Sequence, residues 1–559
     1  MKIPFKHYRL ALGAALIAQV LLVQTQCLAQ EEADPAEIAL GERLFLETRF
    51  AQYFAAHGAG GDPVMDVTET TGAPLPGPFA GAAMNCAACH LVDQHLDRPG
   101  AGMRTYSDFA RRSPVPARED GKTHAVRNSP PLVNAALPRA GGLLAHFDGE
   151  FATLEDLVIA TLSGRNYGWL PDETAQALRH IAAVIRSDDG SGELAQEFGG
   201  PYWQVFAGGP EVEEAFLLPP EYRIDVFAAS DAQVVAAVAR LISAYVADLV
   251  FLQDGTGLFN GSPYDRFLAV NGLPAQPAPG EEDEAYGARL LRAIDRLQTP
   301  IWVTQEHGEF AFHEQEFRFG PTELAGLKHF LRGAPENRRL PPGSSAGNCA
   351  SCHAPPDFTD FHFHNTGVAQ FEYDGLHGDG AFAQLPIPGL VERLIDHDRF
   401  LPATARHPRA LEPFRAIASA EHPGQVDLGL WNIAFNPDFP KPQYRIWASL
   451  CRAERAQRTA RGDSGLVARF SCRPSRLLER SIAAFKTPGL RDLGHSAPYL
   501  HNGAADTLEA VIERYRQASL LARERRLRNA APELGDIRLA SADVAPLAAF
   551  LRALNEDYE

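Results

Sequence analysis

The chain lacks the hallmarks of several protein classes. Its 559 residues contain no apolar run as long as the roughly 20 residues of a membrane span. Basic residues are outnumbered, with 52 Lys and Arg against 70 Asp and Glu, and a net charge of −18 argues against binding to nucleic acid. Hydrophobic residues make up 45% and charged residues 22%, which excludes a disordered or collagen-like chain. A globular protein of about two to four domains remains.

Residues 1–29 have the pattern of a secretory signal peptide. A basic start precedes a largely apolar stretch over residues 10–23, and the small residues near position 29 suit cleavage after Ala29. Removing the signal takes away three positive charges and makes the net charge −21. We therefore expect the mature chain in the periplasm. The alternatives are a lipid anchor on Cys27 and a short buried helix.

Cysteine is also scarce, and four of the seven residues fall in two copies of one pattern. The copies are Cys86-Ala87-Ala88-Cys89-His90 and Cys349-Ala350-Ser351-Cys352-His353. This is the attachment motif of c-type haem, in which two thiols bond the porphyrin and the histidine coordinates its iron. Zinc would need four ligands at each site, and a thioredoxin-like pair would need a βαβ context. The sequence predicts two covalently bound haem c groups, with His90 and His353 as iron ligands.

Two further cysteines remain in the mature chain, Cys451 and Cys472. In an oxidising compartment we expect them to form a disulfide; the alternative is two separate buried thiols. They lie within residues 372–480, a segment with few periodic signals.

Helical periodicity dominates the rest of the chain, and no segment has the alternation of a strand. Helices are predicted from residue 40 onward, after Thr153, over 230–252, over 323–331 and over 541–555. The predicted fold class is mainly α, with two cytochrome c-like haem domains and loop-rich insertions. The predicted organisation is an N-terminal haem domain (30–270), a linker or insertion (271–320), and a C-terminal haem domain (321–559) with an insertion at 372–480.

Other motifs accompany the two haem motifs in a fixed order. They occupy residues 40–45, 127–134, 146–149, 262–268, 363–367, 486–491 and 497–503. On these motifs the chain resembles the bacterial dihaem cytochrome c peroxidases and their relative, the methylamine-utilisation enzyme MauG.

The resemblance implies a function. Hydrogen peroxide would react at the N-terminal haem, and the C-terminal haem would relay electrons from a small donor protein, a cytochrome c or a cupredoxin. In the MauG-like variant, a partner protein would be oxidised instead. A calcium ion would be held by the Asn128 side chain and by backbone carbonyls near Lys486 and Pro488, since calcium prefers oxygen ligands. The alternative for Asn128 is a turn or cap residue.

The chain departs from the family pattern at the catalytic positions. The family has a glutamate about twenty residues after its Trp-Asp-Gly segment, but residues 162–169 contain no carboxylate, and Phe147 stands in place of the tryptophan. Arg165 and Tyr167 are candidates to replace the glutamate. A tyrosine is a poor base and an arginine a poor proton shuttle, so the alternative is a structural role for both.

The sequence also leaves the sixth ligand of each haem iron undecided. The family position for the second haem is Ala505, and none of the four methionines lies in the C-terminal half. Tyr499, His501 or Tyr515 could coordinate this iron, or it is five-coordinate.

His124 is the preferred sixth-ligand candidate at the first haem, with Met103 as the alternative. A peroxidase-type enzyme is the first functional hypothesis, and a non-catalytic dihaem electron-transfer cytochrome is the second.

Overall fold

The computed structural model describes residues 34–57, 85–87, 89–90, 94–95, 103–104, 112–113, 115–139, 141–333, 345–460 and 472–557. The predicted signal peptide lies outside these ranges. Within them the fold is mainly helical, which confirms the predicted fold class, and the named strands are two residues long. β1 (Gln94–His95) pairs antiparallel with β2 (Met103–Arg104), and β3 (Phe363–His364) with β4 (Phe485–Lys486).

The first helical unit precedes residue 252 and has its own core. Its helices are α2 (Ala36–Phe45), α3 (Gln52–His57), α5 (Leu154–Leu162), α6 (Thr174–Ser187), α7 (Glu193–Glu197), α8 (Tyr202–Ala207) and α9 (Asp231–Asp248). α2 starts earlier than the predicted residue 40, because the Pro35 carbonyl accepts the first helical N–H groups. A proline is well tolerated at such a start.

α9 is the central helix of this unit, and α2, α5 and α6 pack against it. Ser230 and Gln233 cap its N-terminus reciprocally, each side chain bonding the backbone N–H of the other. α2 approaches closely at Gly41, where a Cβ atom would lie 2.4 Å from the Leu241 carbonyl oxygen. Glycine therefore permits this crossing. The helix predicted over 230–252 is present, but it ends at Asp248 because Leu249 turns to an extended conformation.

The second helical unit combines residues 263–331 with the C-terminal segment. Its helices are α10 (Pro263–Val270), α11 (Asp283–Asp295), α12 (Pro321–Leu331), α21 (Leu508–Arg523) and α22 (Val544–Arg552). α12 and α22 touch at Gly326, where a Cβ atom would lie 2.0 Å from the Pro546 carbonyl oxygen. Residues 271–320, predicted as a linker or insertion, supply Tyr286, Leu290 and Phe319 to the core of this unit.

Short 3-10 turns join the helices of the molecule. They are η2 (Arg165–Tyr167), η3 (Pro171–Glu173), η4 (Glu214–Phe216), η5 (Pro220–Tyr222), η6 (Gln305–His307), η7 (Cys349–Ser351), η8 (Leu430–Asn432), η9 (Leu493–His495), η10 (Pro532–Asp536) and η11 (Ser541–Asp543). η7 carries the second haem motif.

The insertion at 372–480 is folded around a third core, centred on Trp431, Phe382 and Leu401. Its helices are α14 (Val368–His377), α15 (Ala381–Gln384), α16 (Leu390–Ile395), α17 (His397–Phe400), α18 (Gln443–Ala460) and α20 (Pro474–Arg480). The predicted disulfide between Cys451 and Cys472 is present and ties α18 to the start of α20.

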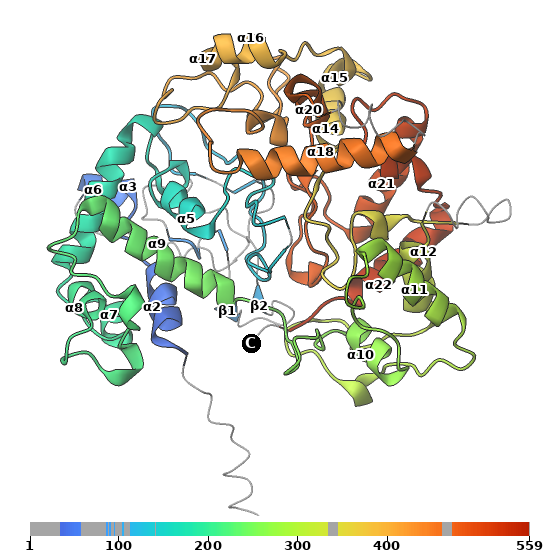
Figure 1. Ribbon diagram of the computed structural model, residues 1–559, viewed down its shortest axis with the longest axis horizontal. Coiled ribbons are helices and arrows are strands. Elements are labelled where there is room, and N and C mark those ends of the chain that lie inside the picture. The colour runs from blue at the N-terminus through green and yellow to red at the C-terminus, as the bar shows by residue number, and fades with distance from the viewer. Residues whose placement is uncertain are drawn as a thin grey trace, which may run out of the picture.

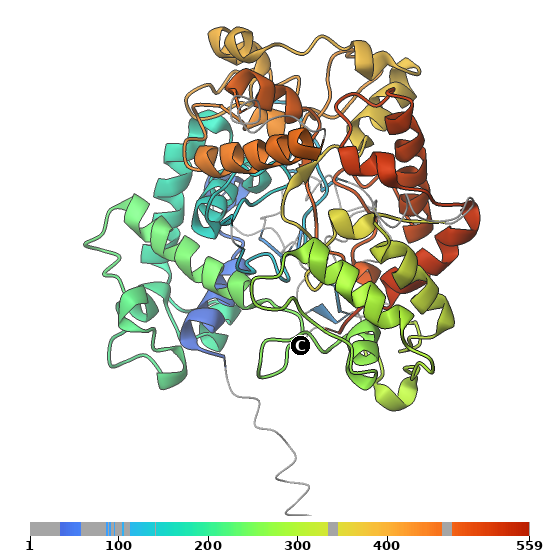
Figure 2. The same cartoon turned by 45° about the vertical axis from the view of Figure 1, so that its right-hand side comes forward.

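The insertion packs against the N-terminal unit. In Figures 1 and 2 it lies at the top of the molecule, with α16 to α18 beside the teal helices of the first unit. Ion pairs cross this contact: Arg127 to Asp427 (2.6 Å), Arg112 to Glu372 (2.6 Å), Arg415 to Glu150 (2.5 Å) and Lys441 to Asp156 (2.5 Å). The insertion thus links the two halves of the chain.

Candidate haem sites

The two Cys-x-x-Cys-His segments fold into the same hydrogen-bonded turn. In the second, the Cys349 carbonyl accepts the backbone N–H groups of Cys352 (3.1 Å) and His353 (2.8 Å). In the first, the Cys86 carbonyl accepts the equivalent two bonds, at 3.1 and 3.0 Å. All four motif cysteines are free thiols. Each turn therefore presents two thiols and one imidazole from a single short stretch of backbone.

The ring of His353 is oriented by the backbone. Its Nδ1–H donates to the Phe358 carbonyl at 3.0 Å, which leaves Nε2 as the nitrogen available to a metal. Burial lowers the pKa of His353, so that the ring is neutral, the form that a metal binds. The geometry suits an axial ligand of haem iron.

A mostly apolar pocket opens at this second turn. Its volume is about 220 Å³. Cys349, Cys352 and His353 line it, together with apolar side chains that include Phe330 and Leu508. Burial raises the pKa of Cys349 to about 12, so its thiol is uncharged. The residues present fit a haem held by two thioether bonds and His353.

The three candidates for the sixth ligand of this haem all line the pocket. The Tyr499 hydroxyl donates to the Leu493 carbonyl at 2.9 Å. Tyr515 lies on α21, and burial raises the pKa of its hydroxyl. Ala505, at the family's ligand position, is 2% exposed. Its carbonyl accepts the backbone N–H of Tyr499 at 2.7 Å.

His501 is the third candidate and differs from the two tyrosines. Its ring stacks on Phe485 with centroids 3.6 Å apart, and burial lowers its pKa to about 3. The ring is therefore neutral at any physiological pH. His501 also lies 6.4 Å from the ring of Phe147, the residue in place of the family tryptophan.

Asn128 meets one requirement of the predicted calcium site. Its Nδ2 donates to the Pro498 carbonyl at 2.7 Å, while Oδ1 is buried and has no hydrogen-bond partner among the described residues. Lys486 and Pro488 line the same pocket. An acceptor oxygen without a donor suits a cation of the calcium class.

The first haem turn has a different environment. Nδ1 of His90 is buried and has no hydrogen-bond partner among the described residues. Burial, assisted by the nearby His146, lowers the pKa of His90 to about 4. Burial also raises the pKa of the Cys86 thiol to about 11. The first imidazole is therefore neutral. The Pro130 carbonyl faces it and opposes the lowering of its pKa, but without a hydrogen bond of the geometry that joins His353 to Phe358.

The predicted catalytic residues take different positions around this turn. The Tyr167 hydroxyl lies 3.2 Å from Cys86 Sγ, and its side chain is fully buried. Arg165 makes two bonds to the Asp120 carboxylate, at 2.7 and 2.8 Å. His124 is exposed, and its ring contacts the Thr123 hydroxyl at 2.9 Å. The structure thus brings Tyr167 to the haem motif, and gives Arg165 and His124 other partners.

Two carboxylates next to these residues escaped the sequence analysis. Glu173, a few residues beyond the inspected stretch, makes two bonds of 2.8 Å to Arg118. Asp120 is held by Arg165, and both carboxyl groups have pKa values below their usual range. Both carboxylates lie far from the haem motif along the chain, so no sequence pattern connected them with it.

A charged cluster beside the first turn was also missed. Glu150 lies 3.2 Å from Nδ1 of His146 and 2.5 Å from Arg415 of the insertion. Burial opposes ionisation of Glu150, but Arg415 holds its pKa well below the usual range. Arg127 bonds Asp427 and pairs with Asp148 at 2.6 Å. The insertion therefore supplies charges close to the first site.

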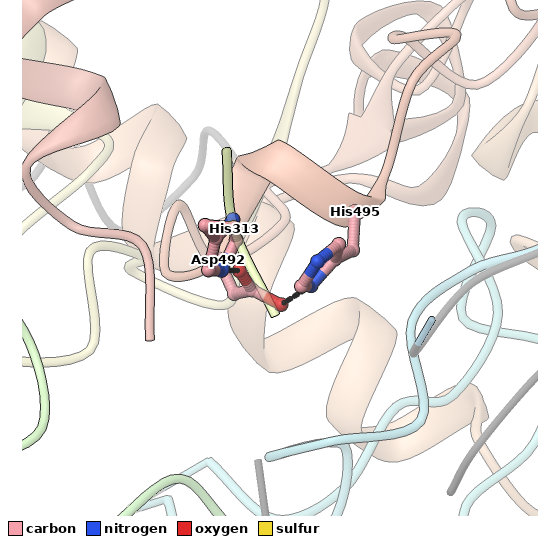
Figure 3. Close-up of side chains that lie close together, drawn as sticks. All are labelled: His313, Asp492 and His495. Atoms are coloured by element: carbon pink, nitrogen blue, oxygen red, sulfur yellow. Dashed lines mark hydrogen bonds and ion pairs between the residues drawn. The ribbon is translucent and has the colours of Figure 1, made fainter. Parts of the chain in front are cut away.

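A histidine–carboxylate cluster lies at the edge of the second unit. Figure 3 shows Asp492 between His313 and His495, which contact its two oxygens at 2.9 Å each. The other nitrogen of His495 donates to the Phe312 carbonyl, and Nε2 of His313 also faces the Glu556 carbonyl. Burial favours the neutral carboxyl, but both histidines hold the pKa of Asp492 at about 2. This is an ion-pair cluster in which both ring nitrogens of His495 and Nε2 of His313 have partners.

The two matching turns and the mainly helical fold are the features on which the chain can be compared with known proteins. No family model matches the chain. It is 38% identical over 79 residues to the cytochrome-c peroxidase IdrP2 of Pseudomonas sp. (strain SCT), and 37% identical over 71 residues to IdrP2 of Denitromonas iodatirespirans. These matches span 14% and 13% of this chain and 19% and 17% of those relatives, about a fifth of their length.

Solved structures similar to the chain carry related descriptions. One is a MauG-like protein associated with microbial copper homeostasis, with a TM-score of 0.43, 16% identity, and coverage of 94% of this chain and 90% of the other. Another is the diheme peroxidase BthA from Burkholderia thailandensis, with a TM-score of 0.41, 18% identity, and coverage of 94% and 87%. Among the described residues, no helix is both long and apolar enough to cross a bilayer.

Proposed function

We propose that the chain is an exported dihaem c-type oxidoreductase of the peroxidase kind. It would reduce hydrogen peroxide at the N-terminal haem, consuming two electrons and two protons per peroxide and releasing two water molecules. The electrons would pass through the C-terminal haem, from a small cytochrome c or cupredoxin or from a partner protein that is oxidised. The observation that carries this proposal is the His353 ring, bonded through Nδ1 to the Phe358 carbonyl and lining one pocket together with Cys349 and Cys352.

When bound, haem supplies one-electron redox chemistry and an open iron position. The chain's own residues set the surroundings. At the second site the Phe358 carbonyl fixes the tautomer of His353, and the apolar wall excludes water. At the first site Tyr167 retains its proton, because burial raises the pKa of its hydroxyl, and the hydroxyl lies against Cys86. Tyr167 can thus donate a hydrogen bond but cannot act as a base.

Three finer assignments belong to the same proposal. Residues 1–29 direct the chain to the periplasm, where c-type haem is attached and the disulfide of Cys451 is stable. Asn128 holds calcium through its unpartnered Oδ1. A mature net charge of −21 favours a donor protein with a basic docking face.

A non-catalytic electron-transfer cytochrome is the second candidate. The observation that favours it is the pairing of Asp120 with Arg165 and of Glu173 with Arg118. Carboxylates locked in this way are poor proton shuttles, and the family glutamate has no free counterpart among these residues.

The two candidates are separated by experiment in two steps. Intact-mass measurement on protein matured in the periplasm should exceed the processed chain by two haem groups; an unmodified mass would end both candidates. The fully reduced protein is then mixed with hydrogen peroxide under anaerobic conditions. If the chain is a peroxidase, its reduced haems become oxidised, and one peroxide is consumed for every two electrons. Catalytic turnover then follows when a reduced small cytochrome c is added. Haem that stays reduced in excess peroxide would exclude the peroxidase, and the electron-transfer cytochrome would then be the remaining candidate.

A further inference from the structure

One surface of the N-terminal unit carries an excess of negative charge. Residues 189–230, which include α7 and α8 and are called the α7–α8 surface below, contain eight acidic residues and one basic residue, Arg223. All eight acidic residues are exposed, and within the described ranges none of them forms an ion pair. Arg186, the basic residue that precedes this segment, pairs with Asp231 at 2.6 Å. The negative charges of the segment are therefore not neutralised by the fold.

The segment folds into one region of the first unit. The Ile224 N–H donates to the Phe206 carbonyl at 2.9 Å, which brings the chain beyond residue 223 back beside α8. The ring of Phe198, directly after α7, lies 6.4 Å from the ring of Phe216. In Figure 1, α7 and α8 lie together at the lower left, on the side of the molecule opposite α10 to α12. The acidic residues therefore share one outer region.

Two exposed aromatic side chains adjoin one another in this region. Trp203 of α8 is 39% exposed and Phe227 is 64% exposed, and their ring centroids are 6.2 Å apart. Single exposed apolar side chains are common on protein surfaces, whereas adjoining ones mark interaction sites. Aromatic residues at the centre and polar residues at the rim are the composition of a protein–protein interface.

The same helix leads inward to the first haem turn. Tyr202, next to Trp203, is buried, and its hydroxyl donates to the Glu47 carboxylate at 3.0 Å. Two residues before Glu47, the Phe45 carbonyl accepts the backbone N–H of Cys86 at 3.0 Å. Covalent bonds and hydrogen bonds thus connect the exposed Trp203 to the first cysteine motif without a gap.

We propose that the α7–α8 surface docks the electron-donating partner of this oxidoreductase, a small redox protein with a basic face. The inference rests on the proposed function and adds the place at which the partner is held. Unpaired carboxylates attract a basic partner during its approach, and the aromatic pair makes the close contact. Because the surface belongs to the N-terminal unit, it offers an entry to the first haem beside the route through the second.

The charge of the surface selects this occupant over others. A second copy of the same surface is equally acidic and would be repelled. Nucleic acid and anionic lipid carry negative charge as well, so they do not match the eight carboxylates. A basic protein face is complementary to them.

Binding of a basic c-type cytochrome tests the proposal. The probe is mitochondrial cytochrome c, added to the full-length holoprotein and followed by calorimetry at about 0.01 M and about 0.15 M salt. We expect binding that weakens at least about 10-fold at the higher salt, because salt screens the attraction between surface charges. An acidic cytochrome of similar size should not bind. Failure of the parent to bind the basic probe at low salt overturns the proposal.

Paired charge variants locate the binding. Glu211→Gln with Glu213→Gln removes two exposed carboxylates that make no hydrogen bond among the described residues. This change should weaken binding at least about 3-fold at low salt. The matched control is Glu306→Gln with Glu309→Gln, two exposed carboxylates of the second unit, which should bind the probe as the parent does.

The aromatic centre is tested by Trp203→Ala, which should weaken binding at least about 5-fold, the size expected for an aromatic anchor. Tyr444→Ala, at an aromatic residue of α18 that is 76% exposed, is its control and should leave the affinity unchanged. Circular dichroism and haem absorbance check that each variant folds. If Trp203→Ala does not fold, the exposed glutamate pair decides.

The outcomes separate this inference from the proposed function. Equal affinity in the surface variants and their controls overturns the docking surface, even where the holoprotein reduces peroxide. Binding that is lost only in the surface variants supports the docking surface, even where the holoprotein does not react with peroxide and the peroxidase is excluded.

Discussion

The two haem turns share a backbone but differ in what surrounds their histidines. The His353 ring donates to the Phe358 carbonyl and faces an apolar pocket. His90 faces the Pro130 carbonyl, makes no well-formed hydrogen bond through Nδ1 among the described residues, and lies near His146 in a charged cluster. A hydrogen bond at the outer nitrogen makes an imidazole a stronger and better-oriented ligand. The comparison indicates that the ring of His353 is the better oriented of the two.

The largest effect is expected from removing one pair of thiols at a time. Cys349→Ala with Cys352→Ala should leave one haem per chain and lower stability strongly, because the apolar pocket loses its filling. Cys86→Ala with Cys89→Ala should also leave one haem. Haem content by the pyridine haemochrome method and thermal unfolding check both. A double variant that keeps two haems would contradict the assignment of its turn.

A smaller effect tests the charges that the insertion brings to the first site. Asp427 is buried against Arg127, so Asp427→Asn should lower the free energy of unfolding by about 3 kcal/mol, because it leaves a buried cation with one partner fewer. Chemical denaturation measures the change. The matched control is Lys441→Ala, which removes an exposed pair of the same interface and should cost less than about 1 kcal/mol. Equal losses of unfolding free energy in the two variants would show that the buried pair contributes no more to stability than the exposed pair.

The smallest effect is expected on the pH dependence of stability, at Asp492. This residue precedes Leu493, which lines the pocket of the second site. The folded-state pKa of Asp492, about 2, lies below the unfolded value, so its contribution is present above about pH 4 and is lost as the pH falls toward 2. The pKa of His313 is raised, so its contribution is present below the unfolded value of about 6.5 and fades at higher pH.

Asp492→Asn should therefore flatten the stability profile of the protein on the acid side and also remove the His313 contribution near neutral pH. Urea denaturation between pH 3 and pH 8 measures both limbs. His422→Ala, a change at an exposed histidine, should leave the profile as it was. If the stability of Asp492→Asn falls at low pH as steeply as that of the parent, Asp492 is not the group responsible for this fall.

The sequence predicted the features that depend on residues close together in the chain. The haem turns follow from a five-residue spacing, and the helix after Thr153 begins as predicted, with the Thr153 side chain accepting the Asp156 N–H. The helix predicted from residue 230 likewise begins there, with Ser230 as its N-cap. The disulfide followed from cysteine number and compartment.

Long-range contacts were not predictable in the same way. Arg127 and Asp427 are 300 positions apart, and a charged residue has no periodicity that points to its partner. α18 was missed within residues 372–480 because its four arginines and one glutamate dilute the apolar pattern. Tyr167 was named from its sequence position, but its contact with Cys86 follows from tertiary packing.

The disulfide between Cys451 and Cys472 has a consequence for maturation. On the proposed route of export, six thiols would enter the oxidising compartment on the mature chain, and any wrong pairing would consume a sulfur that porphyrin attachment needs. The fold joins two of them in a separate core, close in sequence and remote from both Cys-x-x-Cys-His turns. Early closure of this bond would leave four reduced sulfurs for the vinyl groups, so oxidative folding and cofactor attachment can proceed on one polypeptide without competing.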